Sequence, residues 1–321
     1  MLYPLTFKPI FKERIWGGRN LETLYQKPLP PKVPIGESWE ISDRPGDESV
    51  IANGELAGKS LRWLMEARPK ELLGEAAPAV SGRFPLLVKI LDAQQTLSLQ
   101  VHPPAKKAAA LEGEPKTEMW YVADATPEAE LFVGLKRGVT RQEFEEKINR
   151  GTVAECFHRI NVRRGDVMFL PSGRVHALGA GSVIFEIQQN SDTTYRVFDW
   201  NRTDASGKPR ELHVTKSLES IDFNDFEPAL IGGDFLPKGP ALSKSLAKPP
   251  PFGAELKKLS VSKSLENPGG AMRILAVLEG RLCVDDRVSL NPGDFCLIPA
   301  AVDRSKLTAQ SESLFLDVTA V

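Results

Sequence analysis

The sequence is poor in residues that cross-link or anchor a chain. Its 321 residues include three cysteines, Cys156, Cys283 and Cys296, which form no CxxC pair and argue against a disulfide framework. No uninterrupted apolar run reaches about 18 residues, and the first residues lack the apolar core of a signal peptide. These absences predict a cytoplasmic protein without a membrane anchor.

The sequence also lacks an excess of charge of either sign. Lys and Arg total 41 against 42 Asp and Glu, so the formal net charge is −1. Proteins that bind nucleic acid or anionic membranes usually carry a basic excess. We therefore expect neither partner, and any basic groups that matter for function should be local.

Short strands separated by turn residues dominate the pattern. Glycine and proline, 25 of each, punctuate short runs rich in Val, Ile, Leu and Phe, which predicts a mainly β fold. The clearest strands are predicted over residues 84–91, 96–102, 118–123, 129–135, 166–171, 182–189, 272–280, 280–286, 294–299 and 313–318. Helices are expected over residues 60–73, divided at Pro69, over 103–114, and over 140–149, where Thr140 and Glu143 have capping-box spacing.

One segment echoes another far along the chain. GDVMFLPSGRVHAL (165–178) resembles GDFCLIPAAVDRSKL (293–307), which predicts two related β-barrels. The alignment places His176 opposite Arg304, and a second alignment places Glu118 opposite Arg273, so the second barrel should hold no metal in the same way. The Pro- and Gly-rich segment 232–253 is interpreted as a linker. We expect a domain over 1–235 and a smaller domain without metal ligands over 236–321.

Polar side chains in the segment TLSLQVHP indicate a metal site. Strand alternation places Gln100 and His102 on one face, where they are costly to bury without a partner. Glu118 opens the next strand and His176 follows another, so the four groups can converge on a divalent ion. Zinc is the first choice for imidazole and carboxylate ligands, with iron, cobalt or manganese as alternatives. A role for His102 in bonding the backbone, and for Glu118 in a cap or salt bridge, stays open.

Five motifs resemble those of type I mannose-6-phosphate isomerases. They are FKERIWGG (11–18), QVHP (100–103), KTEMWY (116–121), PSGRVHALGAG (171–181) and NSDTTYRVFDWNR (190–202). The resemblance implies two cupin-like (jelly-roll) barrels with a few short helices in the N-terminal half. It also implies one Zn²⁺ per chain, held by Gln100, His102, Glu118 and His176, and interconversion of mannose 6-phosphate and fructose 6-phosphate.

The resemblance further implies roles for single residues around the metal. Arg196 matches the family's catalytic arginine, Lys89 and Lys116 its active-site lysines, and Trp16 an aromatic residue that lines the cleft. Larger relatives often have a histidine ahead of the second lysine, and Pro115 stands there in PKTE. A role for that histidine is therefore not carried over.

The residue types suggest how these groups divide the chemistry. The guanidinium of Arg196 stays protonated, so it is assigned to stabilising an enediolate or positioning substrate oxygens. Lys116, close to a divalent ion, is the first candidate for proton transfer, and Asp192 is the second unless it only forms a turn. Lys89 lies in the apolar run LLVKIL, so it either faces the cavity, where it can bind phosphate, or is paired inside the barrel.

Two other functions fit the same residues. Two histidines and a carboxylate also form the facial triad of Fe(II) oxygenases, although Gln100 and the basic groups weigh against that class. A sugar-binding protein that has lost catalysis is the other alternative, and the intact ligand positions weigh against it. The expected partner is a small sugar phosphate, and the chain is expected to be a monomer or a weak homodimer.

Overall fold

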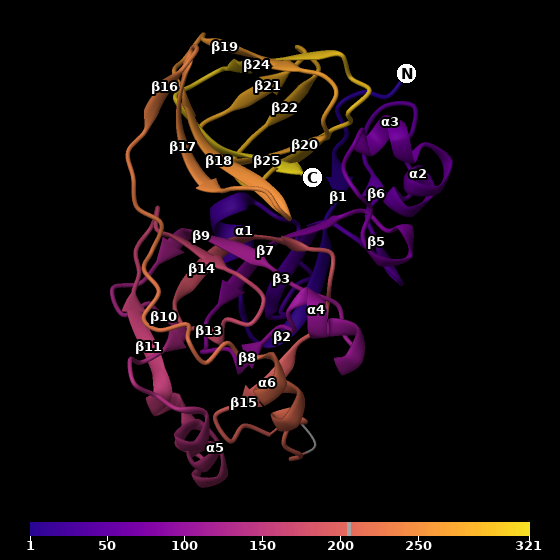
Figure 1. The fold of residues 1–321 in the computed structure, drawn as a ribbon. Coiled ribbons are helices and arrows are strands. Elements are labelled where there is room, and N and C mark those ends of the chain that lie inside the picture. Colours follow the sequence, from indigo (N-terminus) through magenta and orange to yellow (C-terminus); the bar gives the residue numbers. More distant parts are fainter. Residues whose placement is uncertain (204–206) are drawn as a thin grey trace.

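The computed structural model describes residues 1–203 and 207–321, and its fold is mainly β, as the sequence predicts. In Figure 1 the sheets of the N-terminal half (residues 1–235) form the lower part of the molecule, and the C-terminal half (residues 236–321), in orange and yellow, lies above them beside the helices of residues 61–73. The short strands β1 (Phe7–Lys8) and β6 (Val50–Ile51) pair with each other, as do β4 (Asp43–Arg44) and β5 (Asp47–Glu48). No helix in the described part of the chain has the length and apolar character needed to cross a membrane.

Two facing sheets build the N-terminal half. The six-stranded sheet has the order β12 (Val167–Leu170), β9 (Glu118–Ala125), β14 (Ser182–Gln189), β7 (Leu86–Ala93), β3 (Ile35–Ile41) and β2 (Ile10–Gly18). The five-stranded sheet has the order β11 (Phe157–Asn161), β10 (Glu130–Leu135), β13 (His176–Leu178), β8 (Leu99–Val101) and β15 (Tyr195–Phe198). A core that includes Trp120, Leu131 and Ile184 fills the space between them.

The C-terminal half repeats this plan. Its six-stranded sheet has the order β16 (Leu236–Lys238), β17 (Ala241–Ala247), β18 (Phe252–Leu259), β25 (Ser313–Ala320), β20 (Arg273–Glu279) and β23 (Phe295–Ile298). The facing sheet has the order β19 (Ser264–Pro268), β24 (Arg304–Ala309), β21 (Leu282–Val284) and β22 (Val288–Leu290). Leu275, Leu307 and Phe315 belong to the core between them.

Strand pairing supports the sequence echo. Glu118 pairs with Leu170 at the end of β12, and Arg273 pairs with Ile298 at the end of β23, so the two residues hold equivalent positions. Arg273 donates to Asp317 at 2.9 and 2.7 Å, which places an ion pair where the N-terminal half has a carboxylate beside two imidazoles.

The two halves share a third core. Alternation along β14 sends Phe185 and Ile187 to the outer face of its sheet, while Glu186 points to the inner face. Phe185 stacks on Phe295 of the C-terminal half at 5.5 Å between ring centroids, within an apolar cluster drawn from both halves. The boundary near residue 236 stays a prediction, and the shared core ties the two parts together.

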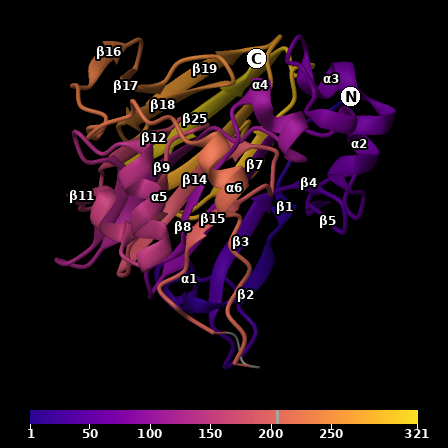
Figure 2. The same cartoon turned by 60° about the horizontal axis from the view of Figure 1, so that its bottom comes forward.

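The helices are short and lie before residue 221 in the described chain. They are α1 (Asn20–Tyr25), α2 (Leu61–Ala67), α3 (Pro69–Leu73), α4 (Ala105–Ala108), α5 (Arg141–Arg150) and α6 (Val214–Ser220). Figure 2 shows α4, α5 and α6 on the side of the molecule turned toward the viewer. The described residues also form three single turns of 3₁₀ helix, at Val80–Gly82, Ala109–Leu111 and Val153–Cys156.

Local signals explain the confirmed helices and two departures. Thr140 accepts a hydrogen bond from the Glu143 amide and caps α5, and Pro69 divides α2 from α3, both as predicted. The helix predicted over 103–114 is wrong in length, because α4 passes into a 3₁₀ turn at Ala109. The linker predicted over 232–253 is wrong as well. It contains β16 and β17, and Pro237 is tolerated because β16 lies at a sheet edge.

Candidate active site

Three buried side chains from three strand ends converge on one point. His102 follows β8, Glu118 begins β9 and His176 begins β13. The two imidazole Nε2 atoms lie 3.2 and 3.0 Å from Oε1 of Glu118, and one ligand atom from each residue lies within 4.8 Å of the others. None of the three residues is more than 1% exposed. Gln100 joins them because it pairs with His176 across the strands.

The hydrogen bonds of the imidazoles leave both Nε2 atoms free to bind a cation. Nδ1 of His102 lies 2.8 Å from the Thr193 carbonyl and Nδ1 of His176 lies 3.0 Å from the Arg174 carbonyl. A carbonyl only accepts, so each Nδ1 carries the proton and each Nε2 presents a lone pair. Such backbone contacts fix the tautomer that metal-bound histidines usually adopt.

The electrostatics make the site a set of acceptors. Burial, and then the Lys116 ammonium, lower the pKa of His102 to about 3, so the imidazole is neutral. Burial alone would raise the pKa of Glu118, but the Lys116 ammonium holds it well below its usual range. Two lone pairs and a carboxylate oxygen at about hydrogen-bond distance repel one another unless a cation lies between them. The residues therefore fit a divalent metal.

Gln100 and Lys116 complete the surroundings of this cluster. The Gln100 amide nitrogen lies 3.2 Å from Nε2 of His176, and a half-turn of the amide would place its oxygen there. Nζ of Lys116 lies 3.0 Å from Oε2 of Glu118 and 3.4 Å from Nε2 of His102. The lysine is 5% exposed, so its amine stands beside the cluster and is shielded from bulk water.

A cavity of about 440 Å³ opens beside the cluster and contains the other predicted residues. Trp16, Lys89, Asp192 and Arg196 line it together with Gln100 and Lys116. Its remaining lining residues are Arg14, Glu37, Leu91, Leu97, Ser98, Glu186, Thr194 and Arg210. Residues from four of the five motifs, together with Lys89, thus meet at one cavity.

Two carboxylates that were not predicted from the sequence surround Lys89. Nζ of this lysine lies 3.3 Å from Glu186 and 3.5 Å from Glu37, and it is 5% exposed. Trp120 donates to Glu186 at 2.8 Å and Arg14 donates to Glu37 at 2.7 Å. Lys89 is therefore paired and also lines the cavity, so the two alternatives left by the sequence are both realised.

Arg196 has a different environment. Its Nη1 donates to the Glu211 carbonyl at 2.8 Å, and its Nε is buried without a hydrogen-bond partner in the described chain. Asp192 lines the same cavity, but no ion pair between Asp192 and Arg196 forms among residues 1–203 and 207–321. The backbone amide of Arg196 donates to Nδ1 of His213, so this histidine has a structural role.

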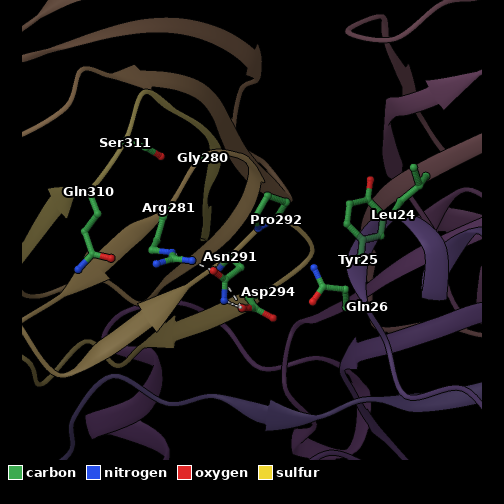
Figure 3. A pocket seen from close by; sticks show the side chains of 10 residues that line it. All are labelled: Leu24, Tyr25, Gln26, Gly280, Arg281, Asn291, Pro292, Asp294, Gln310 and Ser311. Carbon is green, nitrogen blue, oxygen red and sulfur yellow. Dashed lines mark hydrogen bonds between the residues drawn. The ribbon is translucent and has the colours of Figure 1, made fainter.

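A larger cavity of about 860 Å³ lies away from this cluster. Figure 3 shows it between Leu24, Tyr25 and Gln26 on one side and residues of the C-terminal half on the other. Arg281 donates to Asn291 at 3.1 Å on its wall. It contains none of the predicted site residues and no partner for the metal cluster, so volume alone does not identify the active site.

Comparison with known proteins gives a consistent result. Residues 5–147 match the family model described as phosphomannose isomerase type I, catalytic domain. The chain is 38% identical over 316 residues to mannose-6-phosphate isomerase ManA of Bacillus subtilis. This alignment covers 97% of this chain and 98% of that protein. It is 34% identical to mannose-6-phosphate isomerase of Streptococcus mutans, over 94% of each chain.

Solved structures share the fold over the whole chain. The crystal structure of the Bacillus subtilis mannose 6-phosphate isomerase aligns with a TM-score of 0.88 and 32% identity, and it covers 100% of both chains. An archaeal protein from Archaeoglobus fulgidus, titled a putative mannosephosphate isomerase, has a TM-score of 0.76 at 24% identity and supports the fold alone.

Proposed function

Because the chain belongs to the type I phosphomannose isomerase family, we propose that it interconverts D-mannose 6-phosphate and D-fructose 6-phosphate through an enediol or enediolate. One observation carries this proposal. The acceptor cluster of His102, Glu118 and His176 lies against a cavity that also holds Lys116 and Arg196. An isomerase of this kind needs a stabilised oxyanion and a group that moves a proton between neighbouring carbons, and both types of group are in place.

We propose zinc as the metal, one ion per chain, held by Gln100, His102, Glu118 and His176. Neutral imidazoles and a carboxylate are its usual ligands without thiolate, and no cysteine of the described chain belongs to the cluster. When bound, the ion would supply Lewis-acid stabilisation of negative charge on substrate oxygen. Iron, cobalt and manganese can use the same ligands.

Lys116 is the proposed proton carrier. Its amine lies beside Glu118 and next to the cavity, where the neutral form can accept a proton from one sugar carbon and return it to the other. Asp192 stays the second candidate, since its carboxylate lines the same cavity.

Arg196 and Trp16 are proposed to position the substrate. The half-buried guanidinium of Arg196 keeps its charge and offers donors to the sugar oxygens, where it stabilises the enediolate. Trp16 is 5% exposed and closes one wall of the cavity against water. Lys89 is held between Glu37 and Glu186 at the edge of the cavity, where it helps to lower the pKa of Glu37, whereas burial raises the pKa of Glu186.

A coupled assay tests the function directly. The purified protein should form fructose 6-phosphate from mannose 6-phosphate, and metal analysis should give one zinc per chain. Arg196→Ala should lower kcat by about 100-fold or more, in the range reported for the loss of one oxyanion donor, whereas Arg137→Gln, an exposed arginine at a distance, should not. Iron with oxygen uptake and no isomerisation would support the oxygenase alternative instead.

A further inference from the structure

The basic side chains around the cavity differ in how many carboxylates form ion pairs with them. Lys89 lies between Glu37 and Glu186, and Arg14 shares Glu37 with it. Lys116 is paired with Glu118. A dianionic phosphate placed at these groups would meet buried carboxylates as well as cations, so this side of the cavity is a poor anion site.

The opposite side carries an excess of positive charge. Arg210 donates to Asp199 through Nε at 2.7 Å and Nη2 at 2.9 Å, and Arg202 is paired with the same carboxylate. Arg196 has no carboxylate within 4.0 Å in the described chain. Burial, and next the Arg210 charge, lower the pKa of Arg196, which is consistent with two guanidinium groups close together. Among the described residues, Arg202 and Arg210 therefore share one carboxylate, and Arg196 next to them has none within ion-pair distance.

The position of this excess matches the length of a hexose phosphate. Arg196 pairs with Gln100, beside the acceptor cluster, and Asp199 lies three residues further along the chain, beyond the end of β15. Because β15 bulges between Arg196 and Phe198, which pair with Gln100 and Leu99, Asp199 lies about two strand steps, or roughly 7 Å, beyond the partner of Gln100. A hexose 6-phosphate carries its phosphate at the end of the carbon chain away from C1 and C2, where the isomerisation takes place.

We propose that Arg210 anchors the phosphate of the substrate and so selects phosphorylated sugars, an inference that rests on the isomerase function proposed above. Asp199 is 4% exposed and occupies Nε and Nη2 of Arg210, so it fixes the plane of the guanidinium at the cavity wall. Nη1 has no acceptor in the described chain and remains for the anion. A fixed planar guanidinium is well suited to phosphate.

Binding of inorganic phosphate to the metal-loaded protein provides the test. Calorimetry should show that Arg210→Gln weakens phosphate binding by about 10- to 100-fold, as expected for loss of a charge-assisted contact. The KM for mannose 6-phosphate should rise by a similar factor with kcat within about threefold of the parent. Arg210→Lys, which keeps the charge but loses the planar donor, should lie between the two. Arg137→Gln removes one exposed charge far from the cavity and serves as the control.

The outcomes separate this inference from the proposed function. If the parent isomerises mannose 6-phosphate but binds phosphate equally well with and without Arg210, the anchor is wrong and the isomerase stands. If phosphate binding depends on Arg210 but no isomerisation occurs, the anchor stands and the function fails. A fall in kcat as large as the rise in KM, with a lower melting temperature, would show that Arg210 only holds Asp199 in place. If Arg210→Gln does not fold, Arg210→Lys must weaken phosphate binding by at least about threefold, or the inference fails.

Discussion

A buried ion pair fastens the C-terminal half to strand β3. Nζ of Lys27 donates to Glu40 at 2.9 Å and to the Gly293 carbonyl at 2.8 Å, and the two side chains are 8% and 5% exposed. Ser38 donates to the other oxygen of Glu40 at 2.6 Å. Lys27→Met keeps the apolar stem but leaves a buried carboxylate and a carbonyl without their donor. We expect it to lower the free energy of unfolding by about 3–5 kcal/mol.

The pH dependence follows from the pKa of Glu40. Burial raises this pKa despite the opposing charge of Lys27, so the folded state holds the proton more tightly than the unfolded state. The contribution of Glu40 to stability is therefore complete below its unfolded pKa of about 4.3 and is lost as the pH rises through the folded value. Removal of Lys27 raises the folded pKa further, so the loss in Lys27→Met should be larger at pH 8 than at pH 5.

Urea unfolding at both pH values, followed by circular dichroism and tryptophan fluorescence, measures the effect. The apolar core shared by the two halves predicts a single transition with both probes. The double variant Lys27→Met/Glu40→Gln should recover most of the loss, with about 1–2 kcal/mol remaining for the Gly293 carbonyl. Lys216→Met, which breaks an exposed pair with Glu112, should leave the midpoint unchanged. If the double variant is as unstable as Lys27→Met alone, the ion pair is not the source of the stability.

Three further predictions concern the metal, a carboxylate and a thiol. Chelation should abolish isomerisation and lower the melting temperature, and zinc should restore both, because a metal that binds only the folded state stabilises it; an active chelated protein would contradict the proposed site. Burial raises the pKa of Glu37, but Lys89 and Arg14 lower it to about 2, below its unfolded value of about 4.3. Its contribution to stability is therefore present above about pH 4.3 and lost as the pH falls toward 2, and Glu37→Gln should flatten the acid limb of unfolding measured between these values. Burial raises the pKa of Cys156 to about 11, so Ellman's reagent at pH 8 should label it only after unfolding, and rapid labelling of the native protein would refute its burial.

The ligand cluster was accessible from sequence because strand geometry is local. Alternation along β8 places Gln100 and His102 on one face whatever the rest of the chain does. Whether Gln100 and His102 come close to Glu118 and His176 depends on which strands pair, and the pattern of a single strand does not predict strand pairing. The motif resemblance supplied that information, and the pairing of Gln100 with His176 agrees with it.

The two carboxylates that were not predicted, Glu37 and Glu186, lie in strands whose sequences mix apolar and charged residues. Glu37 lies in the segment ESWEI of β3, which carries a carboxylate on each face. Glu37 faces the cavity, and Glu40 faces the C-terminal half. Glu186 had a readable signal, a single acidic residue in the apolar run SVIFEIQQ. It pairs directly with Lys89, the single basic residue of LLVKIL. A single acidic residue in one apolar strand and a single basic residue in another indicate that the two strands are adjacent. A comparison of the two strands would therefore have identified the ion pair.

The C-terminal half lacks the acceptor cluster, yet it touches the elements that build the site. Phe185 packs on Phe295 from one face of β14, and the next residue, Glu186, holds Lys89 on the other face. Glu40 binds Lys27 and Gly293 from one face of β3, and Glu37 lines the cavity from the other. Since a strand cannot shift one face without the other, contacts made by the C-terminal half fix the carboxylates beside Lys89. The C-terminal half, which has Arg273 at the position of Glu118, thus contributes to the candidate active site by packing against the outer face of the N-terminal six-stranded sheet.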